Sequence, residues 1–267
     1  MSGNWPASNE TSLSFCMADQ PYHYTNEHKV SALQNKHGCI IGLLSHCNGI
    51  VSFNGIYHTF IIQFKANGFY KLFRIPVAEF VNKIFYADDV FGRGARDLNE
   101  ALQYSKDIQQ MACFADKFLL SFLNTQKAYI KLYDGITFIS NELFANAPML
   151  TIGQYAYKAN MSVRNFGRRF TEQTGVSPKL YCRLLRFNNA INTKLKNPKN
   201  TWTSVAYECG YYDQMHMIKD FREFANLNPS VLFQSNKELT GSDISAFPEP
   251  VVNNTDEKFV IVKRTYF

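Results

Sequence analysis

Short apolar runs separated by turn residues dominate the first third of the chain, after a polar and irregular start. Runs of this length with β-branched and aromatic residues are typical of strands. Asn-Gly pairs favour the positive φ angles of tight turns, so each pair predicts a strand reversal. The pattern therefore predicts a small antiparallel sheet or partial barrel. The expected strands are 13–17, 39–44, 49–53 and 57–65, and the Asn-Gly pairs lie at 48–49, 54–55 and 67–68.

Beyond residue 68 the apolar positions recur at helical spacing instead. Ile108, Ala115, Phe118 and Phe122 belong to a wide stripe with a period of 3.6 residues, as on the buried face of a helix. We interpret this stripe as core packing, with a surface shared with a second subunit as the alternative. Helices are predicted at 77–86, after Pro76, and at 96–106, 108–123 and 126–145.

The stretch 151–234 contains the same pattern twice. Ser162 and Asp213 each stand eight residues before a Phe, and each of these Phe residues stands eight residues before a Pro. Ser and Asp side chains accept hydrogen bonds from the first turn of a helix, so both residues are predicted N-caps. Two helix-turn-helix units, joined by a helix at 179–195, follow from the pattern. The aligned positions are Ala156, Ser162, Phe170 and Pro178 in the first copy and Ala206, Asp213, Phe221 and Pro229 in the second.

The positive charge of the chain is concentrated in this repeat. Residues 151–235 hold twelve Lys and Arg against five Asp and Glu, whereas the whole chain holds 28 against 22. The repeat therefore carries a net charge of +7, and the remainder, with 16 basic and 17 acidic residues, carries −1. Any single Arg can simply be solvated, but repeat, caps, turns and charge together indicate a protein that binds the DNA backbone.

On these residues the segment resembles the DNA-binding domain of the AraC/XylS family of bacterial transcription regulators. The resemblance implies one recognition helix per unit in successive major grooves, and a linker helix with Arg186 and Ala190 at characteristic positions. Two residues depart from the family pattern: Gly167 replaces a longer polar residue, and Met217 replaces Phe. The matching residues are Ile152, Ala156, Ser162, Arg168, Arg169, Phe170 and 175–178 in the first unit, and Val205, Ala206, Gly210, Tyr211, Asp213, Phe221, Asn228 and Pro229 in the second.

Eight side chains are predicted to lie at the DNA. Arg168 is expected to bond a guanine edge and Met215 to meet a thymine methyl group. Arg169 is expected at a phosphate, together with Lys158 and Lys199. The complete set is Ser162, Arg164, Arg168, Arg169, Gln214, Met215, His216 and Lys219.

The segment 61–92 resembles the sensor domain attached to a subgroup of these regulators, in which more strand precedes the position matched by Ser12. We therefore expect a shortened sheet, with an incomplete ligand pocket or an exposed edge. The expected fold is α+β. Its parts are an α/β sensor or dimerisation domain at 1–147 with a small antiparallel sheet, an all-α double helix-turn-helix domain at 148–235, and a tail at 236–267 with a linker at 236–257 and a strand at 259–262.

Other patterns in the chain exclude several classes of protein. The first fifteen residues lack the features of a signal peptide, and no window approaches 18 apolar residues, so no membrane span is predicted. The six cysteines form no C-x-x-C pair, which favours reduced thiols and a cytoplasmic location. A zinc or copper site is an alternative at His37, Cys39, His46 and Cys47, but we prefer buried thiols and surface histidines there, and we predict no metal and no cofactor.

The predicted function is a sequence-specific regulator of transcription that binds double-stranded DNA and is not an enzyme. The resemblance favours activation, and it implies a small-molecule effector, a homodimer and RNA polymerase as further partners. The alternative is a metal- or thiol-dependent DNA-repair enzyme of the alkyl-transfer type with a DNA-binding module. Such an enzyme needs a zinc-binding cysteine cluster and a reactive thiol, and the sequence contains no such cluster.

Overall fold

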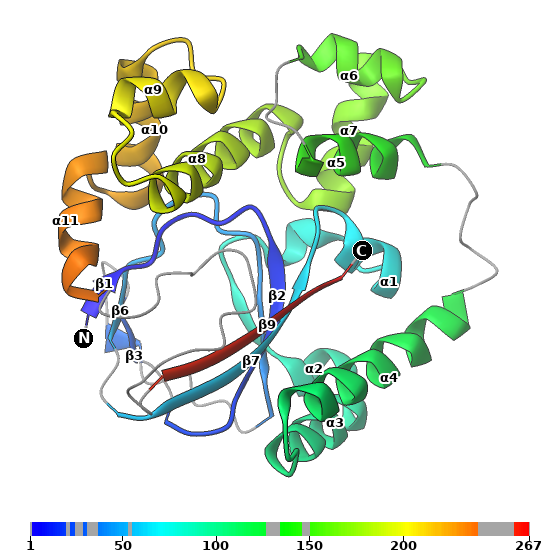
Figure 1. Cartoon of the computed structure of the whole chain (residues 1–267). Helices are drawn as coiled ribbons and strands as arrows, with labels where there is room; N and C mark the ends of the chain where they lie inside the picture. The colour runs from blue at the N-terminus through cyan, green and yellow to red at the C-terminus, as the bar shows by residue number, and fades with distance from the viewer. Residues whose placement is uncertain are drawn as a thin grey trace.

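The fold is α+β, with sheets and helices in the N-terminal part and a helical C-terminal part (Figure 1). The computed structural model describes residues 2–19, 22–24, 29–30, 37–52, 55–126, 134–145, 150–239 and 259–266. None of the helices within these ranges is both long enough and apolar enough to cross a membrane.

The described strands form two open sheets, not a closed barrel. One sheet has the order β1-β6-β3-β4, and the other has the order β8-β5-β2-β7-β9. Strand β2 lies at the centre of the second sheet, antiparallel to both β5 and β7. The strands are β1 (Ser2–Asn4), β2 (Thr11–Cys16), β3 (Tyr22–Tyr24), β4 (Lys29–Val30), β5 (Cys39–Ile41), β6 (Ile50–Ser52), β7 (Tyr57–Phe64), β8 (Ile84–Tyr86) and β9 (Phe259–Tyr266).

The predicted strands are present, but the strand reversals predicted at the Asn-Gly pairs are wrong. Strands β5, β6 and β7 follow one another along the chain, yet β6 belongs to the other sheet, so these neighbours do not pair. Gly49 has a φ of 90° where the chain passes from one sheet to the other. Gly68 begins helix α1 (Gly68–Phe73), and Asn54 lies outside the described residues. Gly49 thus marks a corner between the two sheets.

The helix predicted at 77–86 is also wrong. Val77–Phe80 form a single 3-10 turn, η1, and the chain then enters β8, which pairs with β5. Asn82 has a φ of 58°, and this left-handed conformation ends any helix at that point. Helix α2 (Ala87–Phe91), which contains Asp88 and Asp89, was not predicted. Helices α3 (Arg93–Gln103) and α4 (Ile108–Gln126) agree with the helices predicted at 96–106 and 108–123.

The apolar stripe on α4 packs inside the chain. Ala115 and Leu119 are buried. The Phe122 ring lies edge-on to Phe73, with centroids 5.0 Å apart, and Phe118 lies edge-on to Phe91 at 5.7 Å. The interpretation of the stripe as core is confirmed, and its large aromatic residues are engaged in this core.

The C-terminal part is the doubled unit that the sequence predicts. Helix α8 lies between the pair α6–α7 and the pair α9–α10 (Figure 1). Helix α11 reaches Leu239, so the linker expected at 236–257 begins with helix, and 240–257 lie outside the described residues, as do 127–133 of the helix expected at 126–145. The helices are α5 (Gly135–Ala145), α6 (Ile152–Lys158), α7 (Val163–Thr174), α8 (Pro178–Lys196), α9 (Trp202–Glu208), α10 (Gln214–Ala225) and α11 (Pro229–Leu239).

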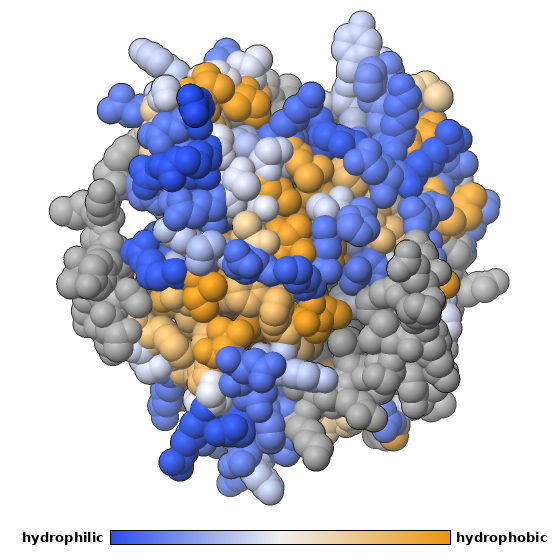
Figure 2. All heavy atoms as spheres, turned by 180° about the vertical axis from the view of Figure 1, so that it is seen from behind, coloured by the Kyte–Doolittle hydropathy of each residue, from blue (hydrophilic) through white to orange (hydrophobic). Residues whose placement is uncertain are grey.

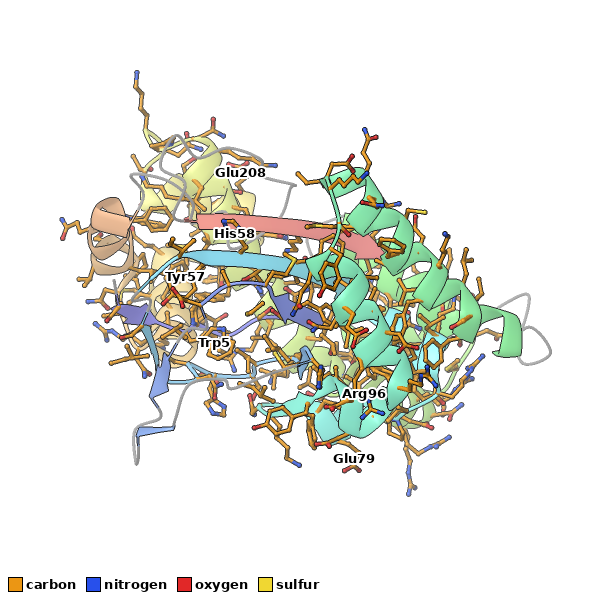
Figure 3. The ribbon with its side chains drawn as sticks, turned by 90° about the horizontal axis from the view of Figure 1, so that it is seen from below. Trp5, Tyr57, His58, Glu79, Arg96 and Glu208 are labelled. Carbon is orange, nitrogen blue, oxygen red and sulfur yellow. The ribbon has the colours of Figure 1, made fainter. Side chains whose placement is uncertain are left out.

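Strand β9 includes the strand expected at 259–262, and it adds to the edge of the N-terminal sheet. It pairs in parallel with β7 over eight residues, and Figure 3 shows it alongside β7 near His58. Arg264 donates to Asp116 of α4 at 2.8 Å. Lys263 lies 3.9 Å from the carboxylate of Glu10, whose pKa is raised to about 7 by burial. Strand β9 therefore covers the edge of β7.

Two apolar cores hold the molecule together. The N-terminal core contains residues of β2, β7, α1, α3 and α4. The other core lies among α5–α11, and it also includes Ala7, Leu43 and Ala66 from the N-terminal part. The C-terminal helices therefore pack directly against the N-terminal part, at segments between its strands and at α1 and η1. Seen from behind, the upper part of the molecule, which carries these helices, is mostly polar, and apolar patches gather in the middle and below (Figure 2).

Candidate nucleic-acid interface

The turns of the two helix-turn-helix units have the same geometry. A residue in the left-handed conformation stands in each turn, Asn160 with a φ of 56° and Gly210 with a φ of 79°. The next residue donates its backbone N–H back to the first helix, to Ala156 at 3.0 Å and to Ala206 at 2.9 Å. Asn and Gly are the residues that tolerate this conformation best. The repeat in sequence is therefore a repeat in structure.

Both predicted N-caps are confirmed. The hydroxyl of Ser162 accepts from the backbone of Asn165 at 3.3 Å, and the carboxylate of Asp213 accepts from the backbone of His216 at 2.7 Å. The bond from His216 lowers the pKa of the Asp213 carboxyl. The side-chain oxygen of Ser162 thus stabilises the start of α7.

Helix α7 separates an apolar face from a basic one. Phe166 and Phe170 are buried. Arg164 and Arg168, one turn apart, are exposed, and the Arg168 side chain is 70% accessible. The Arg168 guanidinium lies 3.3 Å from the side-chain oxygen of Asn165 and 3.8 Å from the carboxylate of Glu172.

Arg169 lies apart from these two arginines. Its guanidinium pairs with Asp134, just before α5, at 3.4 Å, and its side chain is one-third accessible. Lys158, at the end of α6, is likewise paired with Glu142 of α5. Arg169 and Lys158 can therefore bind a phosphate only if their ion pairs with Asp134 and Glu142 break.

Helix α10 presents a mixed face. Met215, His216 and Lys219 are exposed, and Gln214 is half-buried. The hydroxyl of Thr203 in α9 bonds the Gln214 amide at 2.7 Å, and the His216 ring lies 3.0 Å from the Asp213 carboxylate. Met215 and Lys219 occupy the positions that Arg164 and Arg168 occupy in α7, counted from the N-caps. The structure therefore places four of the eight predicted residues on two equivalent faces, with Gln214 and His216 in the first turn of α10, Ser162 in a cap and Arg169 paired with Asp134.

Several cations of the repeat serve the structure. Arg183 of α8 binds Asp220 at 2.7 Å and Glu223 at 2.5 Å, which ties α8 to α10. Burial raises the pKa of the Asp220 carboxyl, against the effect of this guanidinium. The Arg186 guanidinium stacks over the Tyr211 ring at 5.4 Å. The cations of the repeat with exposed side chains are Lys158, Arg164, Arg168, Lys179, Lys196, Lys199, Lys219 and Arg222.

The end of α7 is anchored to the N-terminal part. Asn67 is buried, and its amide donates to Gln173 at 2.8 Å and to Thr137 at 3.0 Å. The hydroxyl of Tyr70 donates to Glu172 at 3.2 Å. Gly175, with a φ of 91°, lies so close to η1 that a β-carbon there would stand 2.6 Å from a methyl group of Val81.

The end of α10 is anchored in the same manner. The backbone N–H of Ala7 donates to the carbonyl of Phe224 at 2.8 Å, and the Asn4 amide donates to the carbonyl of Ala225 at 2.9 Å. Between these two ends, Asn188 of α8 donates to Asn9 at 2.7 Å. The N-terminal segment therefore holds the second unit, and α1 with η1 holds the first.

Sequence reasoning missed the residues that position the exposed side chains. Glu172 stands four residues after Arg168, so its pairing was visible as a helical (i, i+4) spacing. Thr203 and Tyr70 are joined to Gln214 and Glu172 only by the fold, and no local signal marks them.

The environments of the buried cysteines disfavour a reactive thiolate, which the alternative of a thiol-dependent enzyme would need. Cys39, Cys47, Cys182 and Cys209 are buried, and Cys113 is exposed. Burial raises the pKa of the Cys16, Cys47 and Cys209 thiols, and that of Cys182 to about 11, which disfavours the reactive thiolate. Within the described ranges, no group of three or more His, Cys, Asp or Glu side chains is placed to hold a metal ion.

Residues 155–235 match the protein family described as "Helix-turn-helix domain". The transcriptional activator RhaS from Escherichia coli O139:H28 is 34% identical over 74 residues, which are 28% of this chain and 26% of that protein. RhaS from strain K12 / DH10B is 33% identical over 70 residues, 26% of this chain and 25% of that protein. The chain thus spans about a quarter of the length of these relatives.

Two solved structures are similar to this chain at lower sequence identity. ToxT from Vibrio cholerae O395 is 10% identical with a TM-score of 0.48, covering 87% of this chain and 93% of ToxT. The DNA-binding domain of AdpA, solved in complex with a target DNA, is 21% identical with a TM-score of 0.38, covering 42% of this chain and all of that one.

Proposed function

We propose that the chain is a transcription regulator of the AraC type that reads double-stranded DNA with α7 and α10, and the match of residues 155–235 to a helix-turn-helix family and the likeness to the activator RhaS support this. The observation that carries the proposal is the equivalence of the two exposed faces. Arg164 and Arg168 stand on one, Met215 and Lys219 on the other, and both follow an N-cap and the same turn. A recognition helix reads bases with residues near its N-terminal end.

The two faces suit different contacts. Arg164 and Arg168 carry donors for guanine O6 and N7, and Met215 offers an apolar contact for a thymine methyl group. Lys219 and Lys199 provide charge for phosphates, and so does Arg169 once it leaves Asp134. His216 stays a phosphate contact in this proposal, and Gln214 a base contact.

We propose a domain organisation that follows the packing. Ile136, Ile139 and Leu143 of α5 share the core of α6–α11, so the DNA-binding domain begins near residue 134 instead of residue 148. The preceding residues form a domain that tunes DNA binding, through an effector, a second copy of the chain, or both. Action as a cytoplasmic activator that contacts RNA polymerase, and the absence of enzymatic activity, complete the proposal.

The test of this function is the loss of sequence preference when Arg168 is removed. The full chain is used to select duplexes from a random pool, and affinity is then measured on the selected site and on random DNA at one salt concentration. Arg168→Ala is expected to weaken binding to the selected site by ~1–3 kcal/mol and to change binding to random DNA little.

Arg93→Ala is the matched control, because Arg93 is an exposed arginine on α3 in the N-terminal part. It should leave both affinities unchanged. Equal losses on both DNAs for Arg168→Ala would make Arg168 a phosphate contact. A wild-type chain that selects no sequence would refute the proposed function.

A further inference from the structure

Tyr70 occupies the contact between the N-terminal core and the first recognition helix. Its neighbours on α1, Phe69 and Phe73, are buried in that core with ring centroids 4.8 Å apart. The Tyr70 hydroxyl emerges from this contact and donates to the Oε1 atom of Glu172 in α7 at 3.2 Å. Burial raises the pKa of the Tyr70 phenol, and the charge of Glu172 raises it further, so the hydroxyl keeps its proton at neutral pH.

The second oxygen of the same carboxylate faces Arg168. The Oε2 atom of Glu172 lies 3.8 Å from one terminal nitrogen of Arg168, and the other terminal nitrogen donates to Asn165 at 3.3 Å. An exposed ion pair of this kind is weak when both side chains must be ordered to form it. Here the carboxylate is already held from behind by Tyr70, so less conformational freedom is lost when the guanidinium docks against it.

We propose that Tyr70 is a positioning residue for Arg168: acting through Glu172, it couples α1 of the N-terminal core to the reading of bases by α7. This inference rests on the proposed DNA-reading function. The coupling belongs to the first unit. In the second unit Glu223 stands at the position equivalent to Glu172, ten residues after the N-cap, and it is bound by Arg183 of α8.

Removal of the Tyr70 hydroxyl should therefore lower the affinity for the specific DNA site. Without its donor the Glu172 side chain regains rotamer freedom, and Arg168 must be ordered by the DNA itself. Ordering one long side chain on binding weakens specific affinity by about three- to tenfold. Binding to random DNA, which does not need Arg168 in one orientation, stays the same.

A double-mutant cycle on the full chain tests the coupling. Tyr70→Phe, Arg168→Ala and the double variant are compared on the selected site and on random duplex DNA. Tyr70→Phe is expected to lower the ratio of the two affinities by about three- to tenfold when Arg168 is present, and to have no effect when it is absent. Tyr104→Phe is the control, because Tyr104 is 84% exposed at the end of α3.

Equal effects of Tyr70→Phe with and without Arg168, or equal effects on both DNAs, would overturn the positioning role. If Tyr70→Phe fails to fold, the cycle is run with Glu172→Gln, which keeps an acceptor for the Tyr70 hydroxyl and removes the charge beside Arg168. Absence of coupling in that cycle also overturns the role. A wild-type chain with no preferred duplex would overturn the DNA-reading function and this role together, whereas a clear preference without coupling overturns this role alone.

Discussion

Gln214 is the first residue of α10, and its amide is held by another helix. Thr203 in α9 lies 2.7 Å from the amide oxygen, and its hydroxyl donates to that oxygen. The amide hydrogens of Gln214 then point away from Thr203. Adenine is read by an amide that both donates and accepts, whereas guanine O6 and N7 and thymine O4 only accept. Held in this way, Gln214 suits a base that presents acceptors.

Removal of the Thr203 hydroxyl should therefore change which base is preferred. In Thr203→Val the amide is released and can turn to pair with adenine, so we expect the preference at one end of the site to broaden toward adenine. Thr203→Ser keeps the donor and should return the wild-type motif. Sequencing of selected duplexes measures both outcomes, and an unchanged motif for Thr203→Val would show that Gln214 is not oriented by this bond.

At the scale of elements, Gly167 weakens the first recognition helix. It lies inside α7, with a helical backbone, and a β-carbon built on it meets no atom within 4 Å. Glycine costs about 1 kcal/mol relative to alanine in a helix interior, because the unfolded chain is more flexible. Gly167→Ala is expected to stabilise the protein by about 1 kcal/mol, measured by urea unfolding.

Gly42→Ala is the contrasting variant. A β-carbon at Gly42 would overlap the carbonyl oxygen of Phe80 at 1.8 Å, so this substitution should destabilise the fold. If Gly167→Ala proved less stable than the wild type, the space around position 167 would not be open to a methyl group, and this expectation would be wrong.

Local chemistry made the C-terminal helices predictable from sequence. Ser162 and Asp213 act on N–H groups three residues away, and Asn160 and Gly210 set the turns through their own φ angles. Such signals need no knowledge of distant residues. The repeat, both caps, the linker helix and the exposed positions of Arg164 and Arg168 could therefore be read from the chain.

The remaining features depend on contacts far apart in sequence. Asn48-Gly49 lies between β5 and β6, but whether the next strand pairs with the last one or enters another sheet is decided by packing, and here β6 joins β1 and β3. Arg169 has the spacing of a DNA contact, and only the fold brings Asp134 to it. Tyr70 carries no pattern at all until α1 is placed against α7.

At the scale of the whole molecule, the N-terminal part holds both recognition helices at their C-terminal ends. Asn67 binds Gln173 after the reading face of α7, and Ala7 binds Phe224 near the end of α10. Ala7, Leu43 and Ala66 also share the C-terminal core. The relative orientation of α7 and α10 is then set by α8 and by these two anchors together, and their reading faces stay outside the contacts.

This arrangement predicts how binding depends on the distance between the two half-sites. In the full chain, a base pair inserted between the half-sites turns one half-site away from its helix. The resulting loss of binding free energy should approach that of one mismatched base pair, ~1–3 kcal/mol. The isolated segment 134–239 lacks both anchors. It should bind the duplex with the best spacing less tightly than the full chain does, but its affinity should fall less with each inserted base pair. Affinities of both proteins on duplexes with zero to three inserted base pairs test this. Equal losses for the two proteins would show that α8 alone fixes the orientation, because the anchors would then add nothing that the DNA senses.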